Sequence, residues 1–162
     1  MISNLGKGAL GTSGAEDEIH LDLAAELPDN LRAKFDVVFN HTTLEHIYEV
    51  HTAIANLCAL TRDIVILVVP FSQKVHFDWA EGTFLDYWRF TPFALQALFR
   101  EHGLEMVYWS SNENPVYPQY LFVIASRQPE KWKPKFPSLK PITKETAPGY
   151  CWSAGKPPCS MT

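Results

Sequence analysis

Two short apolar runs enclose a helix-length amphipathic segment, and this arrangement constrains the fold more than any other feature. Residues 35–40 (FDVVFN) and 64–70 (IVILVVP) are too short for ordinary helices, and their Val and Ile content is typical of strands buried on both faces. Between them, apolar residues recur at steps of three and four, which indicates one face of a helix. They are Leu44, Ile47, Val50, Ile54, Leu57 and Leu60. The pattern predicts a strand–helix–strand unit with its chemistry at the carboxyl ends of the strands.

The residues around this unit predict further elements. The first helix is expected to begin near Thr43 and to end near residues 61–62. A second helix is expected after Thr91, a good N-cap, with Pro92 at its first position and Gly103 at its left-handed stop. Residues 104–110 and 120–126 then read as two strands joined by a turn-rich stretch. A short strand is also expected at residues 20–23.

Three stretches carry a family resemblance: FDVVFNHTTLEHI, IVILVVPF and DYWRFTPFALQALFREHGLE. Together they resemble the second half of a class I S-adenosylmethionine-dependent methyltransferase of the methyltransferase type 11 kind. The resemblance covers residues 19–127, and LEH and DYWRFTP are its most specific parts. It implies an α/β fold, a truncated Rossmann-like methyltransferase sandwich. Its sheet is expected to be mostly parallel, with an antiparallel strand pair at its C-terminal end.

The resemblance also implies a cofactor and a partner. S-adenosylmethionine is the expected cofactor, but the glycine-rich half that grips it in the family has no counterpart in this chain. We therefore expect another chain to complete the cofactor site. The strand at 35–40 would also lack its neighbour, and an unpaired apolar strand edge is prone to association. A homo-oligomer or a partner subunit is expected to cover that edge, although a fragment of a longer protein would give the same pattern.

The LEH segment supplies the candidate catalytic residues, His46 and Glu45. Because imidazole titrates near neutrality, His46 is a candidate general base toward an acceptor hydroxyl. The alternative is that His46 caps the helix or makes a buried hydrogen bond. Some methyltransferases that this chain resembles carry E-x-x-E-H here and bind a divalent ion. Thr42 replaces the first Glu and removes a hard oxygen ligand, so no metal is predicted.

Three residues are candidates for cofactor binding. Asn40 and His41 end the first buried strand, where this kind of fold presents groups to its ligands. The resemblance implies an acidic residue near the adenine ring after the family's third strand, and Asp22 is the position that fits. The alternative for Asp22 is an exposed loop acid.

The aromatic loop before the second helix supplies the candidate substrate-binding residues His76, Tyr87 and Arg89. Tyr offers a flat apolar surface for a ring or a sugar, and Arg suits a carboxylate or phosphate. The alternative is an internal pair between Asp86 and Arg89.

The resemblance thus implies methyl transfer to a small-molecule or glycan acceptor. The other interpretation is a non-catalytic, degenerate methyltransferase half that acts as a dimerisation or regulatory module.

Composition limits the remaining possibilities. The net charge of −4 gives no electrostatic footprint for nucleic acid, and no apolar run approaches the ~20 residues of a membrane span. Three cysteines do not form a disulfide framework, so a cytoplasmic protein is expected. We expect a flexible leader at 1–18, a methyltransferase-like domain at 19–127 and an arm rich in Pro, Lys and aromatics at 128–162. The leader contains GKGALG, for which nucleotide binding is a third possibility.

Overall fold

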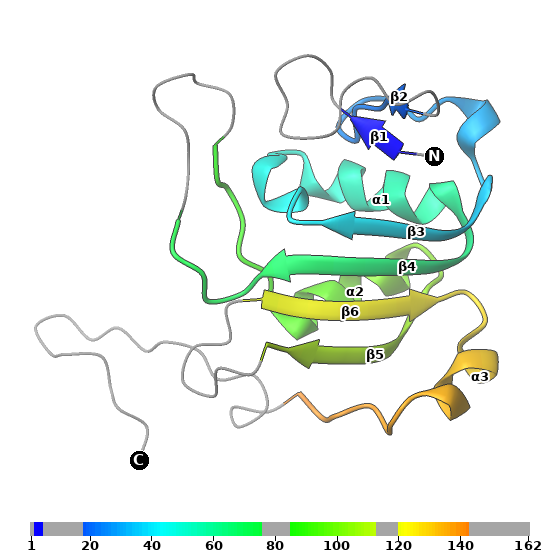
Figure 1. Ribbon diagram of the computed structural model, residues 1–162, viewed down its shortest axis with the longest axis vertical. Coiled ribbons are helices and arrows are strands. Elements are labelled where there is room, and N and C mark those ends of the chain that lie inside the picture. Colours follow the sequence, from blue (N-terminus) through cyan, green and yellow to red (C-terminus); the bar gives the residue numbers. More distant parts are fainter. Residues whose placement is uncertain (1, 5–17, 76–84, 113–119, 143–162) are drawn as a thin grey trace, which may run out of the picture.

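The computed structural model describes residues 2–4, 18–75, 85–112 and 120–142 (Figure 1). Its strands are β1 (Ile2–Asn4), β2 (Glu18–His20), β3 (Phe35–His41), β4 (Thr61–Pro70), β5 (Glu105–Ser111) and β6 (Tyr120–Ser126). Its α-helices are α1 (Val50–Leu60), α2 (Pro92–Glu101) and α3 (Pro129–Trp132). Single 3-10 turns are formed by η1 (Asp29–Leu31), η2 (Leu44–His46) and η3 (Lys133–Lys135).

The main sheet has four strands in the order β3-β4-β6-β5. β3 and β4 are parallel, as the strand–helix–strand pattern predicts, whereas β6 runs antiparallel to both β4 and β5. The antiparallel C-terminal pair is confirmed. The expectation of a mostly parallel sheet is wrong, because the last pair docks against β4 in the antiparallel sense and only one of the three pairings is parallel.

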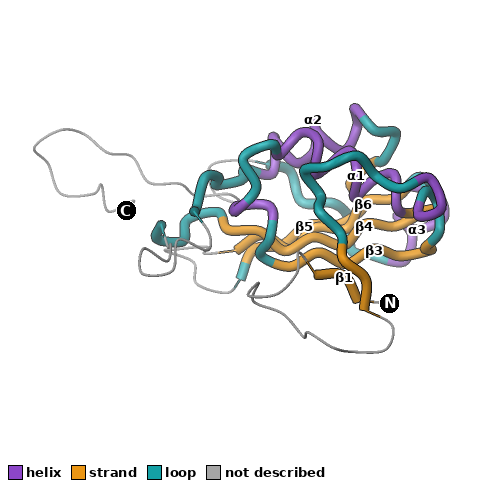
Figure 2. The backbone as a smooth tube through the Cα atoms, turned by 90° about the horizontal axis from the view of Figure 1, so that it is seen from above, coloured by secondary structure: helices purple, strands orange, loops and turns teal. Residues whose placement is uncertain are grey.

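Helices α1 and α2 cover one face of this sheet (Figure 2). Alternate residues of the central strands point into this layer and are fully buried, among them Val65 and Leu67 of β4 and Val123 of β6. The boundaries of α2 agree with the sequence. The Thr91 side chain accepts a hydrogen bond from the Ala94 amide, Pro92 opens the helix, and Gly103 follows it with φ of 72°.

Part of the opposite face of the sheet is covered by the chain after β6. Trp132 and Phe136 pack over a cluster formed by Ile64, Val107 and Ile124. The Trp132 indole donates to the Asp63 carboxylate at 2.9 Å, and the Ser126 hydroxyl donates to the other oxygen of Asp63. The described part of the arm, residues 128–142, therefore packs on the sheet, and it includes the short helix α3. Pro129 stands in the first turn of α3, where proline is tolerated.

The first helix differs from the sequence expectation at its start. Instead of one helix from Thr43, the chain forms the 3-10 turn η2 and then α1, which begins at Val50. The reason lies in the segment before α2. The Tyr87 amide donates to the Glu45 carbonyl at 2.7 Å, and the Trp88 indole donates to the Ile47 carbonyl at 2.9 Å. A continuous helix would need these two carbonyls as acceptors for its own backbone amides, so the helix does not extend back through residues 45–47.

Two further boundaries differ. β4 begins at Thr61 rather than Ile64, because the Thr61 hydroxyl donates to the Asp36 carbonyl and the start of the strand joins β3. The strand expected at 20–23 lies at Glu18–His20 and pairs in parallel with β1, which falls in the segment expected to be a leader. β1 and β2 form a separate two-stranded sheet. Within the described residues, no helix is long and apolar enough to cross a membrane.

Candidate functional site

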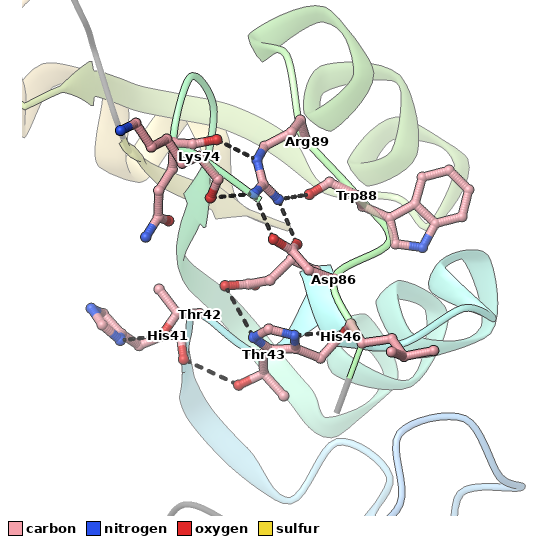
Figure 3. Close-up of polar contacts among 11 residues, drawn as sticks. His41, Thr42, Thr43, His46, Lys74, Asp86, Trp88 and Arg89 are labelled. Carbon is pink, nitrogen blue, oxygen red and sulfur yellow. Dashed lines mark hydrogen bonds and ion pairs between the residues drawn. The ribbon is translucent and has the colours of Figure 1, made fainter. Parts of the chain in front are cut away.

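The carboxyl ends of β3 and β4 lie side by side, and a sharp turn follows β3 (Figure 3). The Thr42 amide donates to the Val68 carbonyl at 2.9 Å, which holds the turn against β4. Thr42 has φ of 47°, in the left-handed region that β-branched residues rarely adopt. Such strain costs about 1–3 kcal/mol and is found mainly at functional sites. Ala33, before β3, has a similar φ of 46°, so the strain at Thr42 supports a site here together with its place at the carboxyl ends of the parallel strands.

Asn40 and His41 are the last two residues of β3 and lead into this turn. The Asn40 Oδ1 atom is buried and accepts no hydrogen bond from any described residue. The His41 ring lies on the opposite sheet face, exposed, with its Nδ1 atom 2.9 Å from the Thr42 hydroxyl, while the Thr43 hydroxyl donates to the His41 carbonyl. A buried amide oxygen without a donor is costly in a folded protein. Asn40 therefore presents an acceptor suited to a ligand that donates N–H or O–H.

Glu45 and His46 follow the turn and contact each other. The Glu45 side chain is fully buried, and one of its oxygens lies 3.8 Å from Nε2 of His46, whose side chain is 19% exposed. The Nδ1 atom of His46 lies 2.9 Å from the Leu85 carbonyl oxygen. Because a carbonyl can only accept, Nδ1 carries the proton and the ring orientation is fixed. The structural alternative for His46, a hydrogen bond, is present as its bond to the Leu85 carbonyl. The arrangement is also compatible with a general base, because a carboxylate lies beside the other ring nitrogen.

Arg89 is the centre of a polar clamp, which comprises Arg89, Asp86 and the backbone carbonyls that Arg89 contacts (Figure 3). Its guanidinium forms a bidentate pair with the buried Asp86 carboxylate. It also donates to the carbonyls of Gln73 and Lys74, each at 2.8 Å, and to that of Trp88 at 2.7 Å. These contacts match the internal Asp86–Arg89 pair that the sequence left as an alternative. The clamp joins the segment after β4 to the segment before α2.

The other candidates lie in different surroundings. Tyr87 is 45% exposed, and its ring stands 5.4 Å from that of Tyr48, which is 66% exposed. Asp22 accepts a hydrogen bond from the Ala24 amide at 2.8 Å and lies in the loop after β2, outside the four-stranded sheet. His76 lies outside the described residues. The structure places Asn40 and His41 at the end of β3 and Glu45 and His46 in the η2 turn that follows, with the His41 ring on the opposite face of the sheet.

Two residues were missed by the sequence reasoning. Tyr48 joins Tyr87 in an exposed aromatic pair, and its proximity depends on the bonds between the η2 turn and residues 87–88. Gln73 has a buried Oε1 atom that accepts no hydrogen bond from the described residues. Neither residue lies in a recognisable motif. The spacing of Tyr48 two residues after LEH was the only available signal.

The fold is similar to that of several solved structures. A methyltransferase dependent on S-adenosylmethionine from Mesorhizobium loti matches with a TM-score of 0.58 and 13% identity, covering 77% of this chain and 78% of that chain. One from Methanosarcina mazei matches with a TM-score of 0.54 and 15% identity, covering 74% and 70%. The chain has a methyltransferase-like α/β fold.

Other matches show the limits of this similarity. A protein from Rhodobacter sphaeroides, assigned as a Zn-dependent alcohol dehydrogenase, matches with a TM-score of 0.53 and 16% identity, covering 68% of this chain and 65% of that chain. The chain spans less than two thirds of the length of this structure and of two others that match, of which it covers 55% and 63%. No family model matches the chain, and no curated protein sequence does so. The comparisons thus give the fold, and the chemistry must come from the site.

Proposed function

We propose that this chain carries a methyltransferase site that uses S-adenosylmethionine and methylates a hydroxyl of a small molecule or glycan. The observation that carries the proposal is the buried Oδ1 atom of Asn40, which lacks a donor among the described residues and lies beside the strained Thr42 turn. Ligands of open α/β sheets bind at this end of the strands. A strained turn with a free acceptor is suited to a ligand site.

The residues present fit such a cofactor in part. Its ammonium, amine and hydroxyl groups are hydrogen-bond donors, and Asn40 offers an acceptor to one of them. His41 is assigned to the lining of the same turn, and Asp22 to the adenosine end. When bound, the cofactor supplies an electrophilic methyl group on a sulfonium ion. The protein's task is then to align the acceptor oxygen with that methyl, so positioning supplies most of the rate enhancement.

In this proposal His46 holds the proton of the acceptor hydroxyl. Its Nδ1 atom is fixed by the Leu85 carbonyl, which leaves Nε2 as the nitrogen that accepts a proton. The Glu45 carboxylate, 3.8 Å from Nε2, stabilises the imidazolium ion that results. Glu45 is therefore a positioning residue, and His46 is the general base.

The aromatic pair of Tyr48 and Tyr87 is assigned to acceptor binding. Both rings are exposed and packed edge to face, which offers an apolar platform for a sugar or another ring. Arg89 was a candidate for direct contact with the acceptor, but its bonds are directed inward. We therefore assign it the role of fixing residues 85–89, from which Tyr87 projects. His76 keeps its sequence-based assignment to the acceptor site.

A second candidate function, a non-catalytic interaction module, is favoured by the exposure of β3. Val37 and Phe39 are 48% and 61% exposed on the sheet face that the arm covers farther along. Another polypeptide chain is proposed to cover this strand.

Calorimetric titration of the purified chain with S-adenosylhomocysteine tests the first proposal. We expect micromolar binding, weakened about tenfold or more by Asn40→Ala, which corresponds to one lost hydrogen bond to a charged or polar group. Asn30→Ala, an exposed amide in η1, is the control and should bind as the unmodified chain does. If no heat of binding is seen up to millimolar ligand, the proposal that this chain alone binds the cofactor is wrong, and the interaction module remains.

A further inference from the structure

Gln73 carries a buried polar group that has no role in the reaction proposed above. It lies in the loop that follows β4, which ends at Pro70. Its Oε1 atom is buried and accepts no hydrogen bond from any described residue, as is true of Asn40 Oδ1. A buried acceptor without a donor is costly, and in a folded protein it calls for an explanation such as a ligand, an ion or a water. Gln73 is therefore a candidate for ligand binding.

The backbone around Gln73 is fixed by other residues. The Arg89 side chain donates from Nε to the Gln73 carbonyl and from a terminal nitrogen to the Lys74 carbonyl, each at 2.8 Å (Figure 3). The Phe90 amide donates to the Pro70 carbonyl at 3.0 Å. The clamp thus holds the loop in place while the side-chain oxygen of Gln73 makes no bond of its own. A rigid backbone that presents an unsatisfied acceptor is suited to receive a donor from outside the chain.

The clamp holds Gln73 on the side of the sheet toward which Asn40 points. Asn40 is in register with Leu67 of β4, whose side chain is fully buried in the layer between the sheet and its helices. Residues in register on parallel strands point to the same face, so Asn40 is directed toward the helices. Arg89 leads directly into α2, one of the two helices on that face (Figure 2). Both amide oxygens therefore belong to the same end and the same face of the sheet.

The surroundings favour a cationic donor. The side chains of Glu45 and Asp86 are fully buried at this end of the sheet, and Arg89 directs its own donors at Asp86 and at backbone carbonyls. A ligand group that enters here meets mainly oxygen acceptors. An ammonium group has three N–H donors and no lone pair, whereas a hydroxyl also has lone pairs that would need a donor. Hydrogen bonds from a charged donor are also the stronger ones.

We propose that Gln73 accepts a hydrogen bond from the ammonium group of a ligand bound at this end of the sheet, and that this group is the ammonium of S-adenosylmethionine. The inference rests on the proposed function, because that function names the cofactor. It adds the part of the cofactor that Gln73 recognises, which is the amino-acid end. A ligand without an ammonium group should therefore bind as well without the Gln73 amide as with it.

Calorimetric titration with two ligands tests the assignment. S-adenosylhomocysteine has the ammonium group, whereas 5′-methylthioadenosine lacks the whole amino-acid part. Gln73→Leu should weaken binding of the first about tenfold or more and leave binding of the second unchanged. Gln73→Glu keeps an acceptor oxygen, so it should bind S-adenosylhomocysteine at least as tightly as the unmodified chain does. The control is Gln128→Leu, an exposed glutamine just after β6, which should alter neither titration.

Urea denaturation shows whether the substitution disturbs the fold. Gln73→Leu should keep the unfolding midpoint of the unmodified chain, because no bond within the fold is lost, and a clearly lower midpoint would contradict the proposal. Equal weakening of both ligands would overturn the assignment to the ammonium group. Undiminished binding of S-adenosylhomocysteine by Gln73→Leu would remove Gln73 from the site and leave the proposed function standing. Absence of binding by the unmodified chain would overturn both, so the two failures are distinguishable.

Discussion

The candidate site contains two neighbouring regions with opposite properties. In the Asp86–Arg89 clamp, a buried carboxylate and a guanidinium satisfy each other, and three carbonyls take the remaining donors. In the turn at Asn40–Thr42, a buried amide oxygen has no donor among the described residues and one residue adopts a strained backbone. Saturated polar groups hold a structure together, whereas unsatisfied and strained ones persist where a ligand needs them. The clamp is thus scaffold, and the turn is the place to look for function.

The largest expected effect comes from breaking the clamp. Arg89→Ala leaves the buried Asp86 carboxylate without its cation, and we expect a loss of about 3–5 kcal/mol in the free energy of unfolding. Arg89→Lys should rescue only part of this, because an ammonium cannot make the bidentate pair. Urea denaturation monitored by circular dichroism measures both. Arg100→Ala, an exposed arginine on α2, serves as control and should have little effect. Equal free energies of unfolding for Arg89→Ala and Arg100→Ala would show that the clamp does not stabilise the fold.

Asp63, at the other end of the sheet, is a second buried carboxylate whose hydrogen bonds are made within the fold, so it should behave like the clamp rather than like the turn. Asp63→Ala leaves the Trp132 indole and the Ser126 hydroxyl without an acceptor, and should cost about 1–3 kcal/mol. The fluorescence of Trp132 should shift as well, because its indole loses the carboxylate to which it is bonded. Asp36→Asn, which breaks an exposed pair with Arg62, is the control, and its effect should be smaller.

The same anchor predicts a pH dependence. Burial alone would raise the pKa of Asp63, but hydrogen bonds from Ser126 and Trp132 and the nearby Lys131 charge lower it below the usual 3.8. A carboxyl group with a lowered folded pKa stabilises the fold above its unfolded pKa, and this contribution is lost as pH falls through the folded value. The unfolding free energy of the unmodified chain should therefore decline below pH 3.8 more steeply than that of Asp63→Ala. Parallel curves for the two proteins would contradict the role of Asp63.

Much of the scaffold was readable from the sequence, whereas the contacts that shape the site were not. Apolar periodicity located β3, β4 and the end of α1 to within about three residues, although α1 begins at Val50 rather than near Thr43, and the Thr91-Pro92 start and the Gly103 stop located α2. These are local signals. The split between η2 and α1 depends on hydrogen bonds between residues 45–47 and 87–88, about 40 positions apart, and no local pattern reports such a pairing. The inward direction of Arg89 and the antiparallel docking of β6 on β4 are tertiary choices of the same kind.

The strain at Thr42 gives an effect of intermediate size. Glycine adopts φ of 47° without the steric cost borne by a residue with Cβ, so Thr42→Gly should be about 1 kcal/mol more stable than Thr42→Ala. Thermal unfolding of the two variants measures the difference directly. If the turn serves ligand binding, Thr42→Gly should also bind S-adenosylhomocysteine more weakly, because the flexible turn no longer fixes Asn40. A stability order with alanine above glycine would show that the turn carries no strain.

The smallest effect on stability is expected at Asn40, in the turn that we compare with the clamp. Its buried Oδ1 atom accepts no bond from the described residues, so Asn40→Ala removes an unfavourable desolvated acceptor but also loses the packing of the side chain, and these opposing terms should leave the unfolding free energy changed by less than about 0.5 kcal/mol. Asn56→Ala is the matched substitution within the core. The Asn56 amide donates to the carbonyls of Leu23 and Ala25 at 2.9 and 2.8 Å, and its loss should cost about 2 kcal/mol.

An asparagine that contributes little to folding but is required for ligand binding belongs to the site. Were Asn40→Ala as destabilising as Asn56→Ala, the Asn40 amide would be part of the scaffold, and the proposal for a cofactor at this turn would lose its main support.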